Sequence, residues 1–121
     1  MANEITTNLR VQIANGTLSV DFNPGRIQAT QTTLGYFDRV ATITTSETTV
    51  ALTGITTPGI AVIYNLDTTN YVEVGTTTAD YPIKLLGAGI PTITRLNAGK
   101  TTLYLKADTA SCKVRILVFE A

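Results

Sequence analysis

The chain has 121 residues, a length that suits one domain able to bury a core without disulfides or metal ions. Nine basic and nine acidic residues cancel to a net charge of zero, so the basic surface typical of nucleic-acid binders is missing and we expect no nucleic-acid partner. The sequence has no apolar run long enough to span a bilayer and no signal-peptide pattern, so we expect no membrane partner and synthesis in the cytoplasm.

Threonine makes up about one residue in five, far above ordinary usage, whereas charged residues make up only 15%. Thr is β-branched and stiff at χ1, so it suits the pleated surface of a strand better than a helix. A face built from Thr is polar but uncharged, and it loses its water at lower cost than a Lys/Glu face. This composition favours an all-β protein whose surface can serve for docking other proteins.

Residues 1–7 are expected to form an extended N-terminal arm, followed by a single β-sandwich domain over residues 8–121. Such an arm can add as a strand to the sheet edge of a neighbouring subunit. The interface residues expected on this basis are Asn3, Glu4, Ile5, Thr6 and Thr7.

Residues 8–22 alternate apolar and polar side chains around Asn15-Gly16, a strong signal for a two-residue hairpin turn. The pattern therefore predicts a β-hairpin over residues 8–22. Asn23-Pro24-Gly25 is expected to close it as a second turn, because these residue types dominate tight turns.

The other expected strands are short and separated by turn residues. They lie at residues 27–31, 36–45, 47–52, 60–66, 71–74, 81–86, 93–96, 103–105 and 112–119. The nearly continuous apolar run at 60–66 predicts a central strand covered on both faces. Residues 103–105 and 112–119 are expected to pair with each other. No segment has a helical period, so the predicted fold class is an all-β, antiparallel β-sandwich.

The sequence contains no histidine, which removes the commonest general base and metal ligand. Four carboxylates in the C-terminal half could converge as a catalytic pair, although their positions beside loops favour a role in capping turns. These residues are Asp67, Glu73, Asp80 and Asp108. We expect no enzyme, and no catalytic, cofactor-binding or metal-binding residues.

Four weaker patterns each have a simpler structural interpretation. Gly99-Lys100-Thr101 resembles the end of a phosphate-binding loop, but a strand pattern follows it where that motif needs a helix, so a turn is favoured. Asp67 to Asn70 offers too few oxygen ligands for Ca²⁺, and a polar turn is favoured. Cys112 alternates in phase with Val114 and Ile116, which favours a buried thiol over a reactive one. The tyrosines could form a sugar-stacking platform, but scaffold roles are favoured; they are Tyr36, Tyr64, Tyr71, Tyr81 and Tyr104.

The C-terminal half carries a resemblance to a known class of protein. The order runs from Asn65-Leu66-Asp67 and Tyr71 to Gly75, through Pro82 to Leu85 and a Gly-rich turn, to Thr102–Asp108 and Cys112–Glu120. Over residues 60–121 this order resembles small β-sandwich virion proteins of tailed bacteriophages. The resemblance implies a jelly-roll-like sandwich with a structural role, forming a homo-oligomer on the particle, often a trimer.

From the resemblance and the missing catalytic groups we expect a capsid decoration or stabilising protein that binds the major capsid protein. It would be made in the host cytoplasm and located on the capsid surface of the virion. Two alternatives remain open at this point. One is a head–tail junction or tail component, and the other is a carbohydrate-binding module on a virion fibre that uses the tyrosines.

Overall fold

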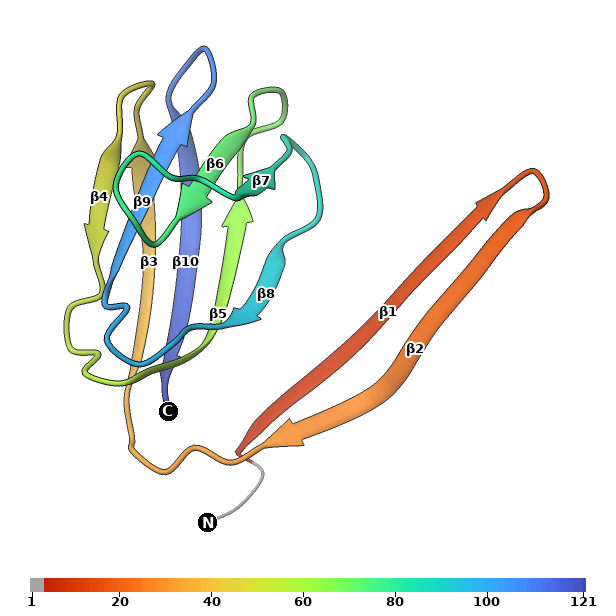
Figure 1. The fold of residues 1–121 in the computed structure, drawn as a ribbon, viewed down its shortest axis with the longest axis horizontal. Coiled ribbons are helices and arrows are strands. Elements are labelled where there is room, and N and C mark those ends of the chain that lie inside the picture. The colour runs from red at the N-terminus through yellow and green to blue at the C-terminus, as the bar shows by residue number, and fades with distance from the viewer. Residues whose placement is uncertain (1–3) are drawn as a thin grey trace. The chain divides into compact units, whose positions relative to one another are not determined.

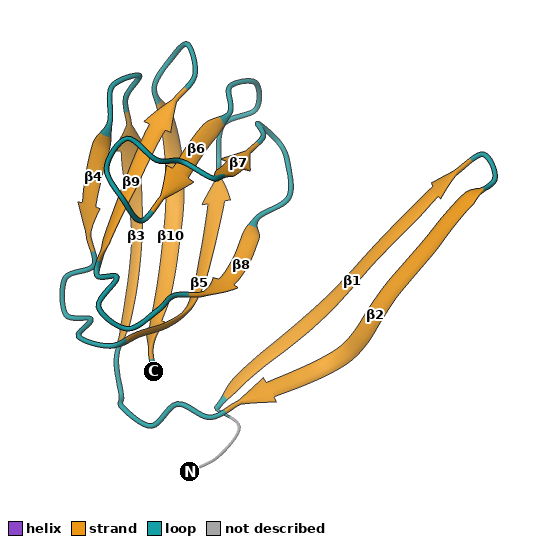
Figure 2. Cartoon of the chain, in the orientation of Figure 1, coloured by secondary structure: helices purple, strands orange, loops and turns teal. Residues whose placement is uncertain are grey.

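The computed structural model describes residues 4–121, and every regular element in that range is a strand (Figures 1 and 2). The strands form antiparallel sheets, so the prediction of an all-β protein is confirmed. The chain divides into two compact units, the first ending at Thr32 and the second spanning Thr33–Ala121. Within residues 4–121 there is no helix with the length and apolar character needed to cross a membrane.

The first unit is a two-stranded hairpin formed by β1 (Ile5–Asn15) and β2 (Leu18–Ala29) (Figure 1). Its ladder runs from the pair Asn15 and Leu18, beside the turn, to the pair Ile5 and Ala29. The hairpin expected at residues 8–22 is therefore present and extends further at both ends. Residues 5–7 belong to β1 rather than to a separate arm, because β2 continues far enough to pair with them, and the division of the chain falls after residue 32 instead of residue 7.

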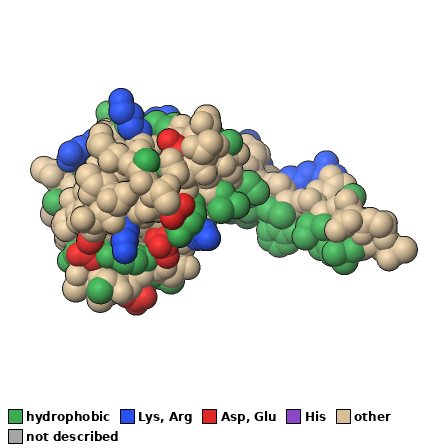
Figure 3. Space-filling model, turned by 90° about the horizontal axis from the view of Figure 1, so that it is seen from above, with side chains coloured by type: hydrophobic (Ala, Val, Ile, Leu, Met, Phe, Trp, Pro, Cys, Tyr) green, Lys and Arg blue, Asp and Glu red, His purple; other side chains and the backbone are tan. Residues whose placement is uncertain are grey.

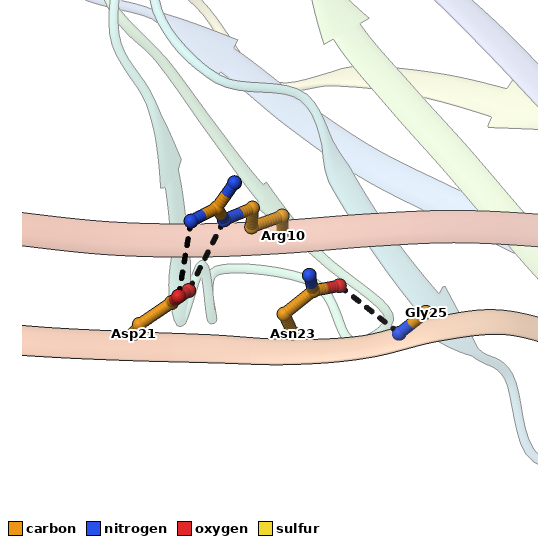
Figure 4. A network of polar contacts seen from close by, with 4 residues as sticks. All are labelled: Arg10, Asp21, Asn23 and Gly25. Atoms are coloured by element: carbon orange, nitrogen blue, oxygen red, sulfur yellow. Dashed lines mark hydrogen bonds and ion pairs between the residues drawn. The ribbon is translucent and has the colours of Figure 1, made fainter.

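Asn23-Pro24-Gly25 is a β-bulge inside β2, not the turn that the sequence pattern suggested. Leu9 pairs with Gly25 and Val11 with Phe22, so two residues of β2 lie opposite Arg10 alone. Gly25 has a φ of +74°, which L side chains rarely adopt, and its N–H donates to the Asn23 side-chain oxygen at 3.1 Å (Figure 4). Pro24 has no N–H to donate, and a bulge tolerates this because its extra residue is unpaired.

The second unit contains eight strands in two four-stranded sheets. The strands are β3 (Tyr36–Ile43), β4 (Thr48–Ala51), β5 (Pro58–Asn65), β6 (Val72–Gly75), β7 (Ile83–Leu85), β8 (Thr92–Arg95), β9 (Thr102–Ala107) and β10 (Cys112–Glu120). One sheet has the order β3-β10-β5-β8 and the other β4-β9-β6-β7. All connections between consecutive strands cross from one sheet to the other, except the one that joins β6 to β7. The predicted antiparallel β-sandwich is confirmed.

The core of the sandwich consists of the inward-facing side chains of both sheets. Strict alternation along β10 places Val114, Ile116 and Val118 in this core with no exposed surface. Leu105 on β9 and Val72 on β6 are fully buried in the same cluster. The sequence pattern of the last strand thus gives its inner face correctly.

The structure differs from the sequence-based predictions in the pairing of the last two strands and in the burial of the strand at 60–66. The strands at 103–105 and 112–119 do not pair, because β9 lies between β4 and β6 in one sheet and β10 lies between β3 and β5 in the other. The strand at 60–66 is central, as predicted, since β5 lies between β10 and β8. However, only its inner face is buried, and Tyr64 on the outer face is 36% exposed.

Candidate interaction surfaces

The hairpin has one face made almost entirely of apolar side chains. Paired residues of an antiparallel ladder lie on the same face, so the register defines this surface directly. We call it the hairpin face; its residues are Ile5, Thr7, Leu9, Val11, Ile13, Asn15, Leu18, Val20, Phe22, Gly25, Ile27 and Ala29. Figure 3 shows apolar side chains gathered along one side of the hairpin. No charged residue belongs to this face.

The bulge is what makes the hairpin face continuous. Leu18, Val20 and Phe22 alternate in one phase of β2, whereas Ile27 and Ala29 alternate in the other. In a regular strand this change of phase would place the two sets on opposite faces. The extra residue at Asn23-Pro24 brings both sets to the same side. The apolar surface therefore follows the whole length of the ribbon.

The opposite face of the hairpin is polar. Arg10 on β1 donates two hydrogen bonds to the Asp21 carboxylate on β2, from Nε at 3.2 Å and from Nη2 at 3.0 Å (Figure 4). This ion pair is well exposed, so it contributes little to stability. Other members of this face are Thr6, Asn8, Gln12, Ser19, Arg26 and Gln28.

The large side chains of the hairpin face remain about half exposed to solvent. Phe22 is 56% exposed, Leu18 53% and Val20 51%. A two-stranded hairpin is marginally stable in water unless its apolar face packs against something. Monomeric proteins also rarely expose a contiguous apolar surface that runs along two whole strands. The hairpin face is therefore a surface suited to protein contact.

A second apolar surface lies on the outside of the sheet β3-β10-β5-β8, and we call it the outer sheet face. The register of β5 with β10 and β8 places its members side by side: Tyr36, Val40, Ile60, Val62, Tyr64, Ile93, Leu117 and Phe119. A hollow of about 430 Å³ on this face is lined by Val62, Tyr64, Gly89, Ile90, Pro91, Arg115 and Leu117. Ile90, one of its lining residues, is 84% exposed.

The outer sheet face differs from the hairpin face because it carries charge. Arg115 on β10 donates to Asp38 on β3 from Nε at 3.0 Å and from Nη2 at 2.8 Å. These hydrogen bonds from the guanidinium lower the pKa of Asp38 and raise the pKa of Arg115. Lys113 and Arg95 project from the same side of the sheet. A partner that covers this face has to accommodate or match the charges.

Glu47 organises the loop that precedes β7. Its carboxylate accepts hydrogen bonds from the Tyr81 hydroxyl at 2.6 Å, the Ala79 N–H at 2.7 Å and the Thr78 hydroxyl at 2.8 Å. The donated bonds, above all that from Tyr81, lower the pKa of Glu47. The same bond and the nearby negative charge raise the pKa of Tyr81 to about 12, because both disfavour the tyrosinate. These three hydrogen bonds hold the loop in place.

We expect Glu47→Gln to lower the pKa of Tyr81 from about 12 towards its ordinary value of 10.0, since the neutral amide removes the charge that opposes tyrosinate formation. NMR of ¹³C-labelled tyrosine rings during a pH titration resolves this one shift from those of the other tyrosines. Thr78→Ala is the control, because it removes one hydrogen bond and leaves the carboxylate in place. An unchanged Tyr81 pKa in Glu47→Gln would contradict the observed contact.

The four carboxylates singled out from the sequence lie in turns, beside loops or on a strand. Asp67 caps its own turn, accepting from the Asn70 N–H at 2.6 Å and the Thr69 N–H at 3.0 Å, and these bonds lower its pKa. Glu73 lies on β6 opposite Lys84 and Lys106. Asp80 and Asp108 both lie in or beside loops, as expected. Within residues 4–121 no three His, Cys, Asp or Glu side chains are grouped so that they could hold a metal ion.

The other sequence candidates also take their structural roles. Cys112 is 1% exposed, and burial raises the pKa of its thiol. Gly99-Lys100 lies in a turn, with the Lys100 N–H donating to the Asn97 carbonyl, and the strand β9 follows. The tyrosines do not form one platform. Tyr36 and Tyr64 lie on the outer sheet face, whereas Tyr104 belongs to the other sheet and Tyr81 to the loop held by Glu47.

The residues expected at an interface have a defined place in the hairpin. Ile5 and Thr7 lie on the hairpin face and Thr6 on the polar face, while Glu4 accepts a hydrogen bond from the Gln31 N–H at 3.1 Å. Asn3 lies outside the described residues. Their role in contacts between subunits stays a prediction. The larger surface to which Ile5 and Thr7 belong was not predicted from the sequence, and the signal for it is the change of apolar phase across residues 23–25.

Comparison of the chain with protein-family models, curated proteins and solved structures found no match in any of the three. The two apolar surfaces and the sequence itself are the features that bear on function.

Proposed function

We propose that this chain is a structural protein of a tailed-bacteriophage virion, which binds the major capsid protein as a homo-oligomer and stabilises the capsid. The observation that carries this proposal is the pair of extensive apolar surfaces on so small a chain, the hairpin face and the outer sheet face. A protein with two such surfaces acts by docking to other proteins. Many identical copies on a shell multiply the effect of each contact.

Two further features support a virion role. The resemblance of residues 60–121 to small phage β-sandwich proteins implies this class. The order of the two sandwich sheets, β3-β10-β5-β8 and β4-β9-β6-β7, supports a jelly-roll-like arrangement of eight strands in two sheets. The separation of the tyrosines between different faces gives no support to a sugar-binding platform.

The proposal is tested by mixing the purified full-length protein with shells assembled from the major capsid protein of the phage that encodes it. We expect co-sedimentation with the shells, saturation at hundreds of copies per particle, and a higher temperature of shell disruption. Binding limited to tens of copies or fewer, with cryo-electron microscopy density at the portal or tail only, would identify a junction or tail protein instead. Shells with no bound protein, and no change in disruption temperature, would refute the capsid role.

A further inference from the structure

We propose that the hairpin face is the self-association surface of this protein, and that it packs against the hairpin face of a second copy of the chain. The inference deepens the proposed function, because it names the surface that holds together the homo-oligomer assumed there. Its basis is the composition, length and area of the hairpin face.

The two candidate partners for this face, a second hairpin face and the outer sheet face, differ in charge. The hairpin face contains no charged side chain over its whole length. Covering the outer sheet face with an uncharged ribbon would remove water from the Arg115–Asp38 pair and from Arg95, and such burial costs free energy that only matched groups repay. Packing one hairpin face on another buries no charge. The uncharged ribbon therefore fits itself better than it fits the outer sheet face.

The two candidate partners also differ in length. β1 has 11 residues and β2 has 12, so at about 3.4 Å per residue the ribbon is close to 37 Å long. The sandwich strands have at most nine residues, or about 30 Å. Because a second copy has the same sequence, its hairpin has the same length and the same hairpin face. The contact between the two copies can therefore extend from the turn to the base of the ribbon. The bulge at Asn23-Pro24 keeps the apolar side chains on the hairpin face over that entire length.

The exposed area of the hairpin face also fits an interface between two copies. Seven large apolar residues of the hairpin face are 39–56% exposed. Taking about 200 Å² for a fully exposed residue of this size, they present roughly 690 Å² per copy. Two copies face to face would bury about 1,400 Å², which lies within the range of specific protein interfaces, about 1,200–2,000 Å². A third copy packed around the same axis would add further area.

The test compares two variants of the full-length chain that each gain one cysteine, Val11→Cys on the hairpin face and Gln12→Cys on the polar face. Both positions lie near the middle of β1, so Val11 is covered whether the copies run parallel or antiparallel. We expect maleimide labelling of Val11→Cys to be about tenfold or more slower than that of Gln12→Cys at high protein concentration, because reactivity follows exposure. On dilution the two rates should converge as the oligomer dissociates. The native Cys112 is buried and adds the same small background to both variants.

Sedimentation equilibrium of the unlabelled protein supplies the second readout. We expect a mass of two or more times the 12.9 kDa chain, falling to the monomer in Val20→Asp and unchanged in the polar-face control Ser19→Asp. Because Val20→Asp could also unfold the hairpin, the labelling of the intact hairpin is the decisive measurement.

Several results would overturn the inference. A monomeric mass at all concentrations would overturn it. This holds both when Val11→Cys is labelled quickly and when its own chain protects it from labelling. An oligomer that persists in Val20→Asp with rapid labelling of Val11→Cys indicates another surface. Protection that appears only when capsid shells are added assigns the hairpin face to a different protein. Failure to bind shells with hairpin-mediated oligomers intact would refute the capsid role alone and leave this inference standing.

Discussion

Substituting Ile116 by alanine is expected to lower the free energy of unfolding of the sandwich by about 2–5 kcal/mol. Ile116 has no exposed surface and lies on β10, which is hydrogen-bonded to β3 on one side and to β5 on the other. The substitution removes three carbons from the closed core and leaves a cavity that the flanking strands cannot fill without moving. Since domains of this size have a total stability of about 5–15 kcal/mol, the loss is a large fraction of the whole.

Urea denaturation followed by circular dichroism measures the effect, because the chain has no tryptophan to report on the core. Val40→Ala is the matched control: it shortens an apolar β-strand residue that is 52% exposed on the outer sheet face. We expect it to cost less than about 1 kcal/mol. Equal losses in the two variants would mean that the outer sheet face contributes to stability as much as the core, and would contradict the assignment of β10's inner face to the core.

The regular parts of the fold could be predicted because period-2 alternation is a local property. The inner face of β10, with Val114, Ile116 and Val118, follows directly from it. Pairing between strands is not local. Neighbours along the chain such as β9 and β10 lie in different sheets, and no pattern within either strand shows that the chain crosses the sandwich between them.

The hairpin also shows that strand pairing cannot be predicted from a local pattern. Asn23-Pro24-Gly25 has the composition of a turn, and only the pairing of Leu9 with Gly25 and of Val11 with Phe22 shows that it is a bulge. Once the bulge is known, the positions of Ile27 and Ala29 on the hairpin face follow. The apolar run of β5 is a related case. Its continuous pattern indicated cover on both faces, and the structure leaves its outer side chains partly exposed.

Substituting Gly75 by alanine is expected to destabilise the sandwich by about 3 kcal/mol or more, at the upper end of what overpacking costs. Gly75 is the last residue of β6 and is buried. A Cβ added there would lie far inside van der Waals contact with the Asp80 backbone carbonyl and at 3.2 Å from Cδ of Pro82. Backbone atoms cannot rotate away as a flexible side chain can, so the loop 76–81 has to move as a unit.

Because Glu47 holds that loop through Thr78, Ala79 and Tyr81, the displacement has a local signature. Gly75→Ala should break the contact with Tyr81, and the pKa of Tyr81 should fall from about 12 towards 10.0 together with the loss of stability. Asp80→Ala is the matched control, since it shortens a side chain of the same loop without adding an atom near Gly75; we expect it to retain both properties. A Gly75→Ala variant with unchanged stability and an unchanged Tyr81 pKa would show that β6 and the loop are not in the close contact described. A loss of stability with the Tyr81 pKa unchanged would instead show that β6 yields while the Glu47 cluster keeps its place.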